Sequence, residues 1–264
     1  MLISFRREKG HVIDAHCHIE QDDYDGDREQ VIAECKNELR AIVCSATQSK
    51  HFSKALEIAK AHEGFVFFAF GIHPEYVKDV AAEDIADFKE FVKANKRHVV
   101  AIGEVGLDYH WVTESKWQEK QRTLFREMIR FAKHENLPLV IHCRDAIQDL
   151  LAILEDERAE RVLLHMFGSH NDVERVVKNG WNISCNYIIS RSKTYRKVAK
   201  KCPMENLMLE TDSPWLSFTD ERNTPLTIKK VAEKIAEEKG IGFDEVWKAC
   251  GQNASKFFGL NGIC

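Results

Sequence analysis

Short apolar segments alternate with amphipathic segments along nearly the whole chain. Eight apolar runs have the length and residue types of buried β-strands. They are His11–His16, Arg40–Ser45, Phe65–Gly71, His98–Glu104, Leu139–His142, Val162–His165, Trp181–Ser184 and Asn206–Asp212.

Between these runs, apolar residues recur every three to four positions, which is typical of helices with one buried face. The expected helices are Asp27–Leu39, Phe52–His62, Ile85–Ala94, Trp117–Glu135, Ala146–Glu155, Asn171–Asn179 and Thr194–Cys202. After the last strand we expect helices over Thr227–Lys239, Phe243–Ala249 and Asn253–Phe258.

Strands that alternate with helices predict a parallel sheet covered by helices, and eight such units close into a (β/α)8 TIM barrel. An open doubly wound sheet would usually carry a glycine-rich phosphate loop after its first strand. Here the first strand leads into His16-Cys17-His18 instead. No linker or repeat interrupts the pattern, so we expect an α/β protein with a single domain over residues 1–264.

Composition adds limits to this picture. The chain has 264 residues, of which 44% are hydrophobic and 30% charged, as in globular proteins. No apolar run approaches the roughly 20 residues that span a bilayer, and Met1–Gly10 lacks the apolar core of a signal peptide. Eight cysteines without a CxxC pair favour reduced thiols, and we expect a cytoplasmic protein.

The formal net charge of −4 argues against bulk attraction to nucleic acid. A nucleic-acid partner would therefore need a local basic patch or bound metal ions.

Two histidines follow the first strand. His16 and His18 are two positions apart, so on an extended chain their side chains point the same way and can bind one ion. Ordinary hydrogen bonding is the alternative for two histidines at a strand end.

Four more residues of metal-binding type end other predicted strands. Glu104, His142, His165 and Asp212 end the fourth, fifth, sixth and eighth strands. Barrel enzymes place their active sites at this end of the strands, so we expect the six side chains to converge on one rim.

The segments that carry these residues resemble, in order, the motif series of the TatD-like deoxyribonucleases of the amidohydrolase superfamily. They are DAHCHIE, GIHP, GEVGLD, IHCRDA, HMFGS and ETDSP, and they lie between residues 12 and 225. The resemblance implies a barrel-shaped, metal-dependent hydrolase with DNA as its substrate. One departure is Met166, where the family commonly has cysteine; we expect this residue to face away from the metals.

The resemblance also implies two divalent metal ions per chain. His16, His18 and Asp212 would bind one ion, His142 and His165 the other, and Glu104 would bridge both. Imidazole ligands suit zinc, whereas carboxylates and a phosphate substrate suit magnesium or manganese.

Two cations would activate a shared water for attack on a phosphodiester. We expect Asp212 and Glu104 to be catalytic, with Asp212 as the general base. His73, in GIHP, is expected to bind phosphate or protonate the leaving oxygen; a hydrogen-bonded loop histidine is its alternative. Glu210 shares the face of Asp212 and is expected to orient a ligand from behind.

Two arginines are candidates for contact with substrate phosphate. Arg144 follows His142, and its planar guanidinium suits phosphate, although it can equally pair with Asp145. Arg191 begins the basic run Arg191–Lys201, which is either a phosphate contact or a solvated helix face.

Two other functions remain open. A small amide, lactone or phosphate ester would use the same ligands, because loops choose the substrate. A barrel that binds nucleic acid or a partner without catalysis would not need six converging ligands. We expect DNA as the partner, no membrane association and no obligate protein partner.

Overall fold

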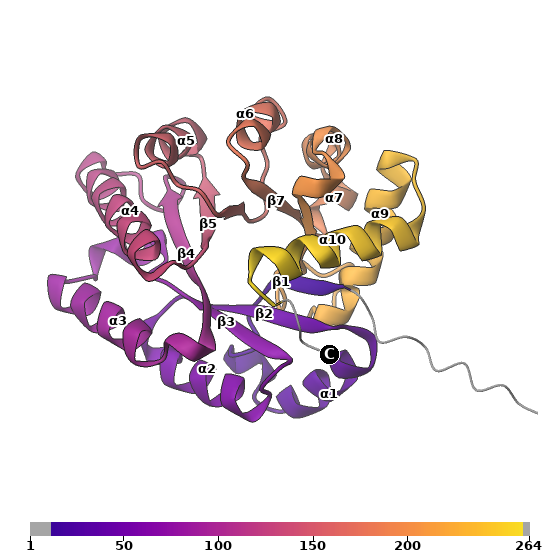
Figure 1. Ribbon diagram of the computed structural model, residues 1–264, viewed down its shortest axis with the longest axis horizontal. Helices are drawn as coiled ribbons and strands as arrows, with labels where there is room; N and C mark the ends of the chain where they lie inside the picture. The colour runs from indigo at the N-terminus through magenta and orange to yellow at the C-terminus, as the bar shows by residue number, and fades with distance from the viewer. Residues whose placement is uncertain (1–11, 261–264) are drawn as a thin grey trace, which may run out of the picture.

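The computed structural model describes residues 12–260, in which eight strands form one parallel sheet in the order β1 to β8 (Figure 1). This confirms the predicted barrel. The strands are β1 (Ile13–Cys17), β2 (Ala41–Ala46), β3 (Val66–Phe70), β4 (Val99–Asp108), β5 (Leu139–Arg144), β6 (Val162–Leu164), β7 (Asn182–Cys185) and β8 (Leu207–Leu209). The segment Met1–Gly10 and His11, the predicted start of the first strand, lie outside the described residues.

Helices follow the strands and surround the sheet (Figure 1). They are α1 (Arg28–Glu38), α2 (Ser49–Ala61), α3 (Ala82–Ala94), α4 (Ser115–Glu135), α5 (Ile147–Asp156), α6 (Val173–Lys178), α7 (Ile188–Arg191), α8 (Lys193–Lys201), α9 (Ile228–Lys239) and α10 (Phe243–Phe257). Short 3-10 helices cover Asp22–Tyr24, Pro74–Lys78, Lys96–His98, Met204–Asn206 and Pro225–Thr227. Within residues 12–260, no helix combines the length and apolarity needed to cross a bilayer.

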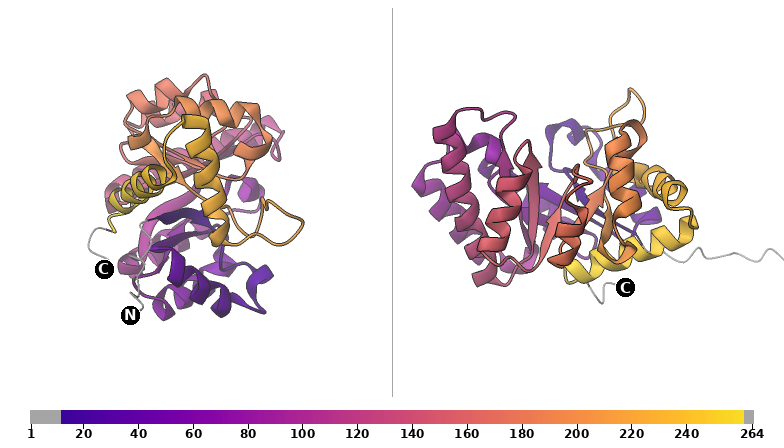
Figure 2. Two further views of the ribbon diagram at one scale, coloured as in Figure 1. Left: turned by 90° about the vertical axis from the view of Figure 1, so that its right-hand side faces the viewer. Right: turned by 90° about the horizontal axis from the view of Figure 1, so that it is seen from above.

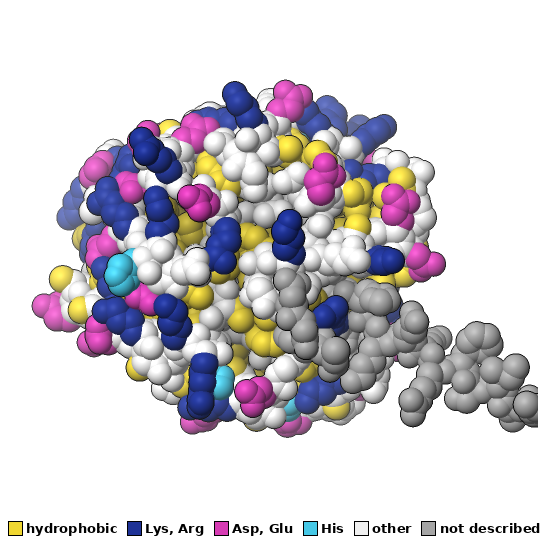
Figure 3. All heavy atoms as spheres, in the orientation of Figure 1, with side chains coloured by type: hydrophobic (Ala, Val, Ile, Leu, Met, Phe, Trp, Pro, Cys, Tyr) yellow, Lys and Arg dark blue, Asp and Glu magenta, His cyan; other side chains and the backbone are white. Residues whose placement is uncertain are grey.

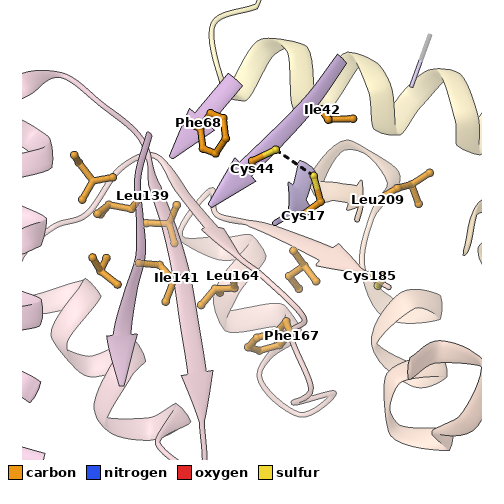
Figure 4. Close-up of a cluster of buried hydrophobic side chains, with 14 of the residues drawn as sticks. Cys17, Ile42, Cys44, Phe68, Leu139, Ile141, Leu164, Phe167, Cys185 and Leu209 are labelled. Carbon is orange, nitrogen blue, oxygen red and sulfur yellow. Dashed lines mark hydrogen bonds between the residues drawn. The ribbon is translucent and has the colours of Figure 1, made fainter. Parts of the chain in front are cut away.

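The alternation of side chains along each strand produces two apolar layers. In β2, Ala41 and Val43 face the barrel interior, where small residues dominate, while Ile42 and Cys44 face the surrounding helices. Figure 4 shows part of this outer layer, in which the Sγ atoms of Cys17 and Cys44 lie 3.4 Å apart. Cys17 therefore points away from the barrel axis, as its position between two histidines predicts.

Helix α10 closes one end of the barrel. Its residues Ala254 and Phe257, with Phe258 just beyond it, pack against the interior layer of the strands. In the right-hand view of Figure 2 the strand arrows point away from α10, so the carboxyl ends of the strands form the opposite, open end. Figure 3 views the closed end, where Lys and Arg side chains are interspersed with Asp and Glu.

The segment after β8 completes the barrel by bonding to β1. The Asp212 amide donates to the His16 carbonyl oxygen over 2.9 Å, and the His18 amide donates to the Ser213 carbonyl oxygen over 2.7 Å. These two bonds place Asp212 beside both histidines.

Several predicted boundaries were wrong. Strand β8 ends at Leu209 rather than Asp212, which has a left-handed φ of 55°. Glu104 does not end its strand, because β4 continues to Asp108. The two expected C-terminal helices are one helix, α10, since buried Gly251 is held in helical conformation by packing despite its low propensity.

Candidate metal centre

The six predicted ligands lie together at the open end of the barrel. His16 and Glu104 are carried by β1 and β4, and His142 by β5. His18 directly follows β1 and His165 directly follows β6, while Asp212 lies in the segment after β8. Five of these side chains are buried and His142 is half-buried, so the protein shields most of the cluster from bulk water.

Four donor atoms converge on one side of the cluster. The Nε2 atoms of His16 and His18 are 3.1 Å apart. Glu104 Oε1 lies 3.3 Å and 3.4 Å from these two nitrogens. Asp212 Oδ1 lies 3.6 Å and 3.4 Å from the same nitrogens. This group contains the whole set expected for the first metal, with Glu104 added.

The other oxygen of Glu104 faces a second group. Glu104 Oε2 lies 3.1 Å from His165 Nε2, 3.6 Å from His142 Nδ1 and 3.8 Å from His73 Nε2. Glu104 thus stands between the two groups with one oxygen toward each.

Hydrogen bonds on the outer ring nitrogens orient the histidines. His18 Nδ1 lies 2.8 Å from the Ser45 carbonyl oxygen, and His142 Nε2 lies 2.8 Å from Asp108 Oδ2. Because these oxygens accept, each outer nitrogen carries the proton, and in a neutral ring the inner nitrogen presents its lone pair to the cluster. This is the arrangement that protein metal ligands have, so the donor set fits divalent cations.

Glu210 lies behind His165, as the sequence predicts. Its Oε1 is 3.5 Å from His165 Nδ1 and accepts hydrogen bonds from the Asn186 side chain (2.8 Å) and the Met166 amide (3.1 Å). Ser184 donates to Oε2. These bonds hold the fully buried carboxylate on the outer side of the His165 ring.

The charges of the cluster favour cations. Burial alone would raise the pKa of Glu104, but the imidazoles of His16 and His165 outweigh it and hold that pKa well below its usual range. Likewise, burial opposes protonation of His165 and His18, yet neighbouring carboxylates raise the pKa of both rings well above the ordinary value. The carboxylates therefore attract positive charge into this part of the barrel.

Two buried aspartates that support the cluster escaped prediction. Asp108, the bond partner of His142, lies four residues after Glu104 in GEVGLD, and this even spacing was the available signal. Asp14 accepts from the His16 and Thr211 amides and from the Thr211 hydroxyl, which ties β1 to the segment after β8. Burial raises the pKa of Asp14 well above its usual range.

His73 differs from the other histidines of the cluster. Its Nδ1 accepts from the Glu75 amide over 3.3 Å, so the proton of a neutral ring is on Nε2, the nitrogen that points toward Glu104. Burial, assisted by the nearby His142, lowers the pKa of His73 to about 3. At neutral pH the ring is therefore an uncharged donor that faces the second group.

The two arginine candidates lie at the rim. The Arg144 guanidinium lies 5.5 Å from the Trp111 ring centroid, whereas Asp145 bonds His110 at 3.2 Å. Within residues 12–260, Arg144 and Asp145 form no ion pair with each other. Arg191 is exposed and stacks on Tyr187 at 4.7 Å.

Part of the basic run Arg191–Lys201 has structural partners. Arg196 lies 3.5 Å from Glu238 and donates to the carbonyl oxygens of Ile189 and Ser190. Lys201 pairs with Glu174 at 3.1 Å. The end of the run is thus a helix face with its own ion pairs.

Left-handed backbone conformations gather at the same rim. Asp145, Met166, Asp212 and Leu216 have φ values between 45° and 56° and follow β5, β6 and β8. Such conformations cost about 1–3 kcal/mol each and persist where the surrounding structure imposes them, often at ligand sites.

Comparison with known proteins gives a consistent result. A family model described as TatD related DNase matches residues 13–259. The chain is 37% identical to the uncharacterized metal-dependent hydrolase YabD of Bacillus subtilis (strain 168), over 95% of this chain and 100% of that protein. It is 34% identical to the human deoxyribonuclease TATDN3, over 94% of each chain.

A solved structure of a TatD homologue has the same fold as this chain. A crystal structure of YJJV, a TatD homologue from Escherichia coli K12, matches with a TM-score of 0.87 and 27% identity, over 94% of this chain and 98% of that chain.

Proposed function

The chain belongs to the TatD-related DNase family of metal-dependent hydrolases, and on that premise we propose that it hydrolyses phosphodiester bonds of DNA at the cluster around Glu104. The observation that carries this proposal is the placement of Glu104, whose two oxygens face two separate sets of imidazole nitrogens at 3.1–3.6 Å.

Two divalent cations would occupy this centre. His16, His18 and Asp212 with Glu104 Oε1 would hold one, and His142 and His165 with Glu104 Oε2 the other. When bound, such cations supply Lewis-acid chemistry, which lowers the pKa of water and polarises a phosphoryl oxygen. The four imidazoles suit zinc, while the carboxylates and a phosphate substrate suit manganese or magnesium.

Side chains of the protein would supply the general base, a hydrogen-bond donor and the phosphate contacts. Asp212, whose pKa is lowered by its bond to His18 despite burial, is ionised and accepts the proton of the attacking water. His73, with its proton on Nε2, donates a hydrogen bond to a phosphoryl or leaving oxygen. Arg144 and Arg191 contact flanking phosphates from the rim.

The test is a turnover screen. Protein reconstituted separately with zinc, manganese and magnesium is assayed against single-stranded DNA, duplex DNA, small phosphate esters, amides and lactones. Hydrolysis of DNA that chelators abolish is the expected result. Efficient turnover of a small ester with inert DNA would instead assign the same centre to a small-molecule hydrolase.

A further inference from the structure

A cavity of about 530 Å³ adjoins the ligand cluster and shares His165 with it. Its walls come from the segments after β5, β6 and β8 and from α7 and α8. The lining includes Arg144, Phe167, Ile188, Tyr195 and Leu216. The volume lies within the roughly 300–1,000 Å³ of small-molecule sites, so one nucleotide-sized group fits.

The backbone is shaped to keep this space open. Met166 and Leu216, which line it, have left-handed φ values of 45° and 56°. A Cβ atom on Gly168 would lie 2.7 Å from the Tyr195 hydroxyl oxygen, so Tyr195 can occupy its position only because residue 168 is glycine. Tyr195 thus approaches the backbone of residue 168 closely and forms part of the wall.

Two polar groups at the cavity have no protein hydrogen bond. Across residues 12–260, neither the Tyr195 hydroxyl nor the Arg144 guanidinium has a hydrogen-bond partner, and Arg144 is placed only by its contact with Trp111. Burial raises the pKa of Tyr195 to about 12, so its hydroxyl stays protonated at neutral pH. A ligand with an apolar flat body, polar edges and an anionic group complements these walls.

We propose that this cavity is a base pocket, which holds one unstacked nucleobase beside the phosphodiester to be cleaved. Tyr195 contacts the base, and Arg144 at the mouth contacts a flanking phosphate. Aromatic side chains bind bases of any sequence in this way, and arginine suits phosphate. This inference rests on the proposed function, because the pocket adjoins the cluster and a nucleic-acid substrate presents a base next to the phosphodiester that is cleaved.

The experiment measures binding without turnover. Metal-free protein in chelator is titrated with a single-stranded tetranucleotide by calorimetry, and then with variants of it that are abasic at one position in turn. We expect a single position at which removal of the base weakens binding roughly 5–150-fold, the range for loss of one stacked base.

Variants of the pocket make the test specific. Tyr195→Ala should weaken binding of the intact tetranucleotide by a similar factor and leave binding of the tetranucleotide abasic at that position unchanged. Tyr195→Phe, which keeps the ring, should retain most of the base dependence. Ile188→Trp fills the pocket from α7 and should act like Tyr195→Ala. Thermal unfolding of each variant identifies any that do not fold.

Arg144→Gln provides a matched comparison, because it should weaken intact and abasic tetranucleotides by the same factor. The base pocket is refuted if intact and abasic ligands bind the wild-type protein equally, or if Tyr195→Ala and base removal act independently. Either result can occur while the protein still hydrolyses DNA, which would leave the proposed function standing. A protein that neither binds nor cleaves any oligonucleotide would overturn both.

Discussion

The position of one proton decides what each histidine of the centre can do. His18 and His142 donate hydrogen bonds from their outer nitrogens to the Ser45 carbonyl oxygen and to Asp108, so in the neutral rings the inner nitrogens present lone pairs to the cluster. His73 accepts a hydrogen bond on its outer nitrogen, which leaves a proton toward the cluster. In the proposed centre, residues of one type would therefore act as ligands in two cases and as a hydrogen-bond donor in the third.

Asp212→Asn should separate metal binding from catalysis. Asparagine keeps an oxygen for coordination but cannot accept a proton from water, so turnover should fall about 10²–10⁴-fold with metal content nearly unchanged. His16→Ala removes a buried ligand and should lower metal content as well as turnover. Metal content and turnover are measured on the same preparations. Near-normal turnover of Asp212→Asn would place the general base elsewhere.

Asp108→Asn tests the support of His142. The charge of Asp108 raises the basicity of the ring that it bonds at 2.8 Å, and loss of such a partner typically weakens metal affinity about 10–100-fold. Metal titration with a competing chelator measures the change. Asp149→Asn is the matched control, since this exposed carboxylate bonds Tyr109 instead. Equal affinities in wild type and Asp108→Asn would show that His142 does not need this bond.

At the scale of elements, the periodicity of the sequence predicts the strands well and their ends poorly. Alternation is a property of each strand alone, so β2 and β3 were predicted within one residue. The end of β4 depends on pairing with β5 as far as Arg144, and the conformation of Asp212 depends on its bonds to β1. These contacts between distant segments leave no local pattern.

The convergence of the six candidate ligands was predictable because metal chemistry restricts the residue types, and their order along the chain matched a family. Asp108 and Asp14 were not predicted. The even spacing of Asp108 from Glu104 was a usable signal, whereas the bonds of Asp14 to Thr211 join distant segments and leave no local pattern. The helix α7 was missed as well, since its four residues are too few to show a helical period.

The start of the basic run on α7 and α8 should carry the electrostatic part of DNA binding. Arg191, Lys193 and Lys197 are exposed, whereas Arg196 is held by Glu238. Neutralising the first three together should weaken DNA binding. The slope of log K against log salt concentration should become shallower by about 0.7–0.9 for each phosphate contact that is lost. Binding is measured across a salt series.

The matched control neutralises Lys60, Lys248 and Lys256. Lys248 and Lys256 are exposed on α10, the helix at the closed end of the barrel, and Lys60 lies in the exposed last turn of α2. The charge change is identical, so overall attraction falls equally in both variants. Equal loss of affinity in the two would mean that net charge, rather than the rim, governs binding.

At the scale of the whole molecule, the centre includes the seam where the segment after the last strand, β8, meets the first strand, β1. Its candidate ligands come from β1 and the residue after it, β4, β5, the segment after β6 and the segment after β8. In the described residues, parallel pairing runs from β1 to β8 in sequence order, while the closing contact between β8 and β1 is made by the segment around Asp212. Cations bound here would join the first and last parts of the sheet.

Metal binding should therefore stabilise the entire barrel, and wild-type protein should take up two equivalents per chain. A ligand present at 1,000 times its dissociation constant contributes about 4 kcal/mol to the free energy of unfolding. Two such cations contribute about 8 kcal/mol, so for a protein of this size we expect the unfolding midpoint to rise by roughly 10–20 °C. Calorimetry in metal and in chelator, with elemental analysis of the same samples, measures both quantities.

Glu104→Gln removes the shared carboxylate and should abolish most of the shift, whereas Glu233→Gln, on α9, should keep it. A saturating metal content below one equivalent per chain, with full activity, would contradict the two-metal centre. An unchanged midpoint at full occupancy would show that closure of the barrel does not depend on the cations.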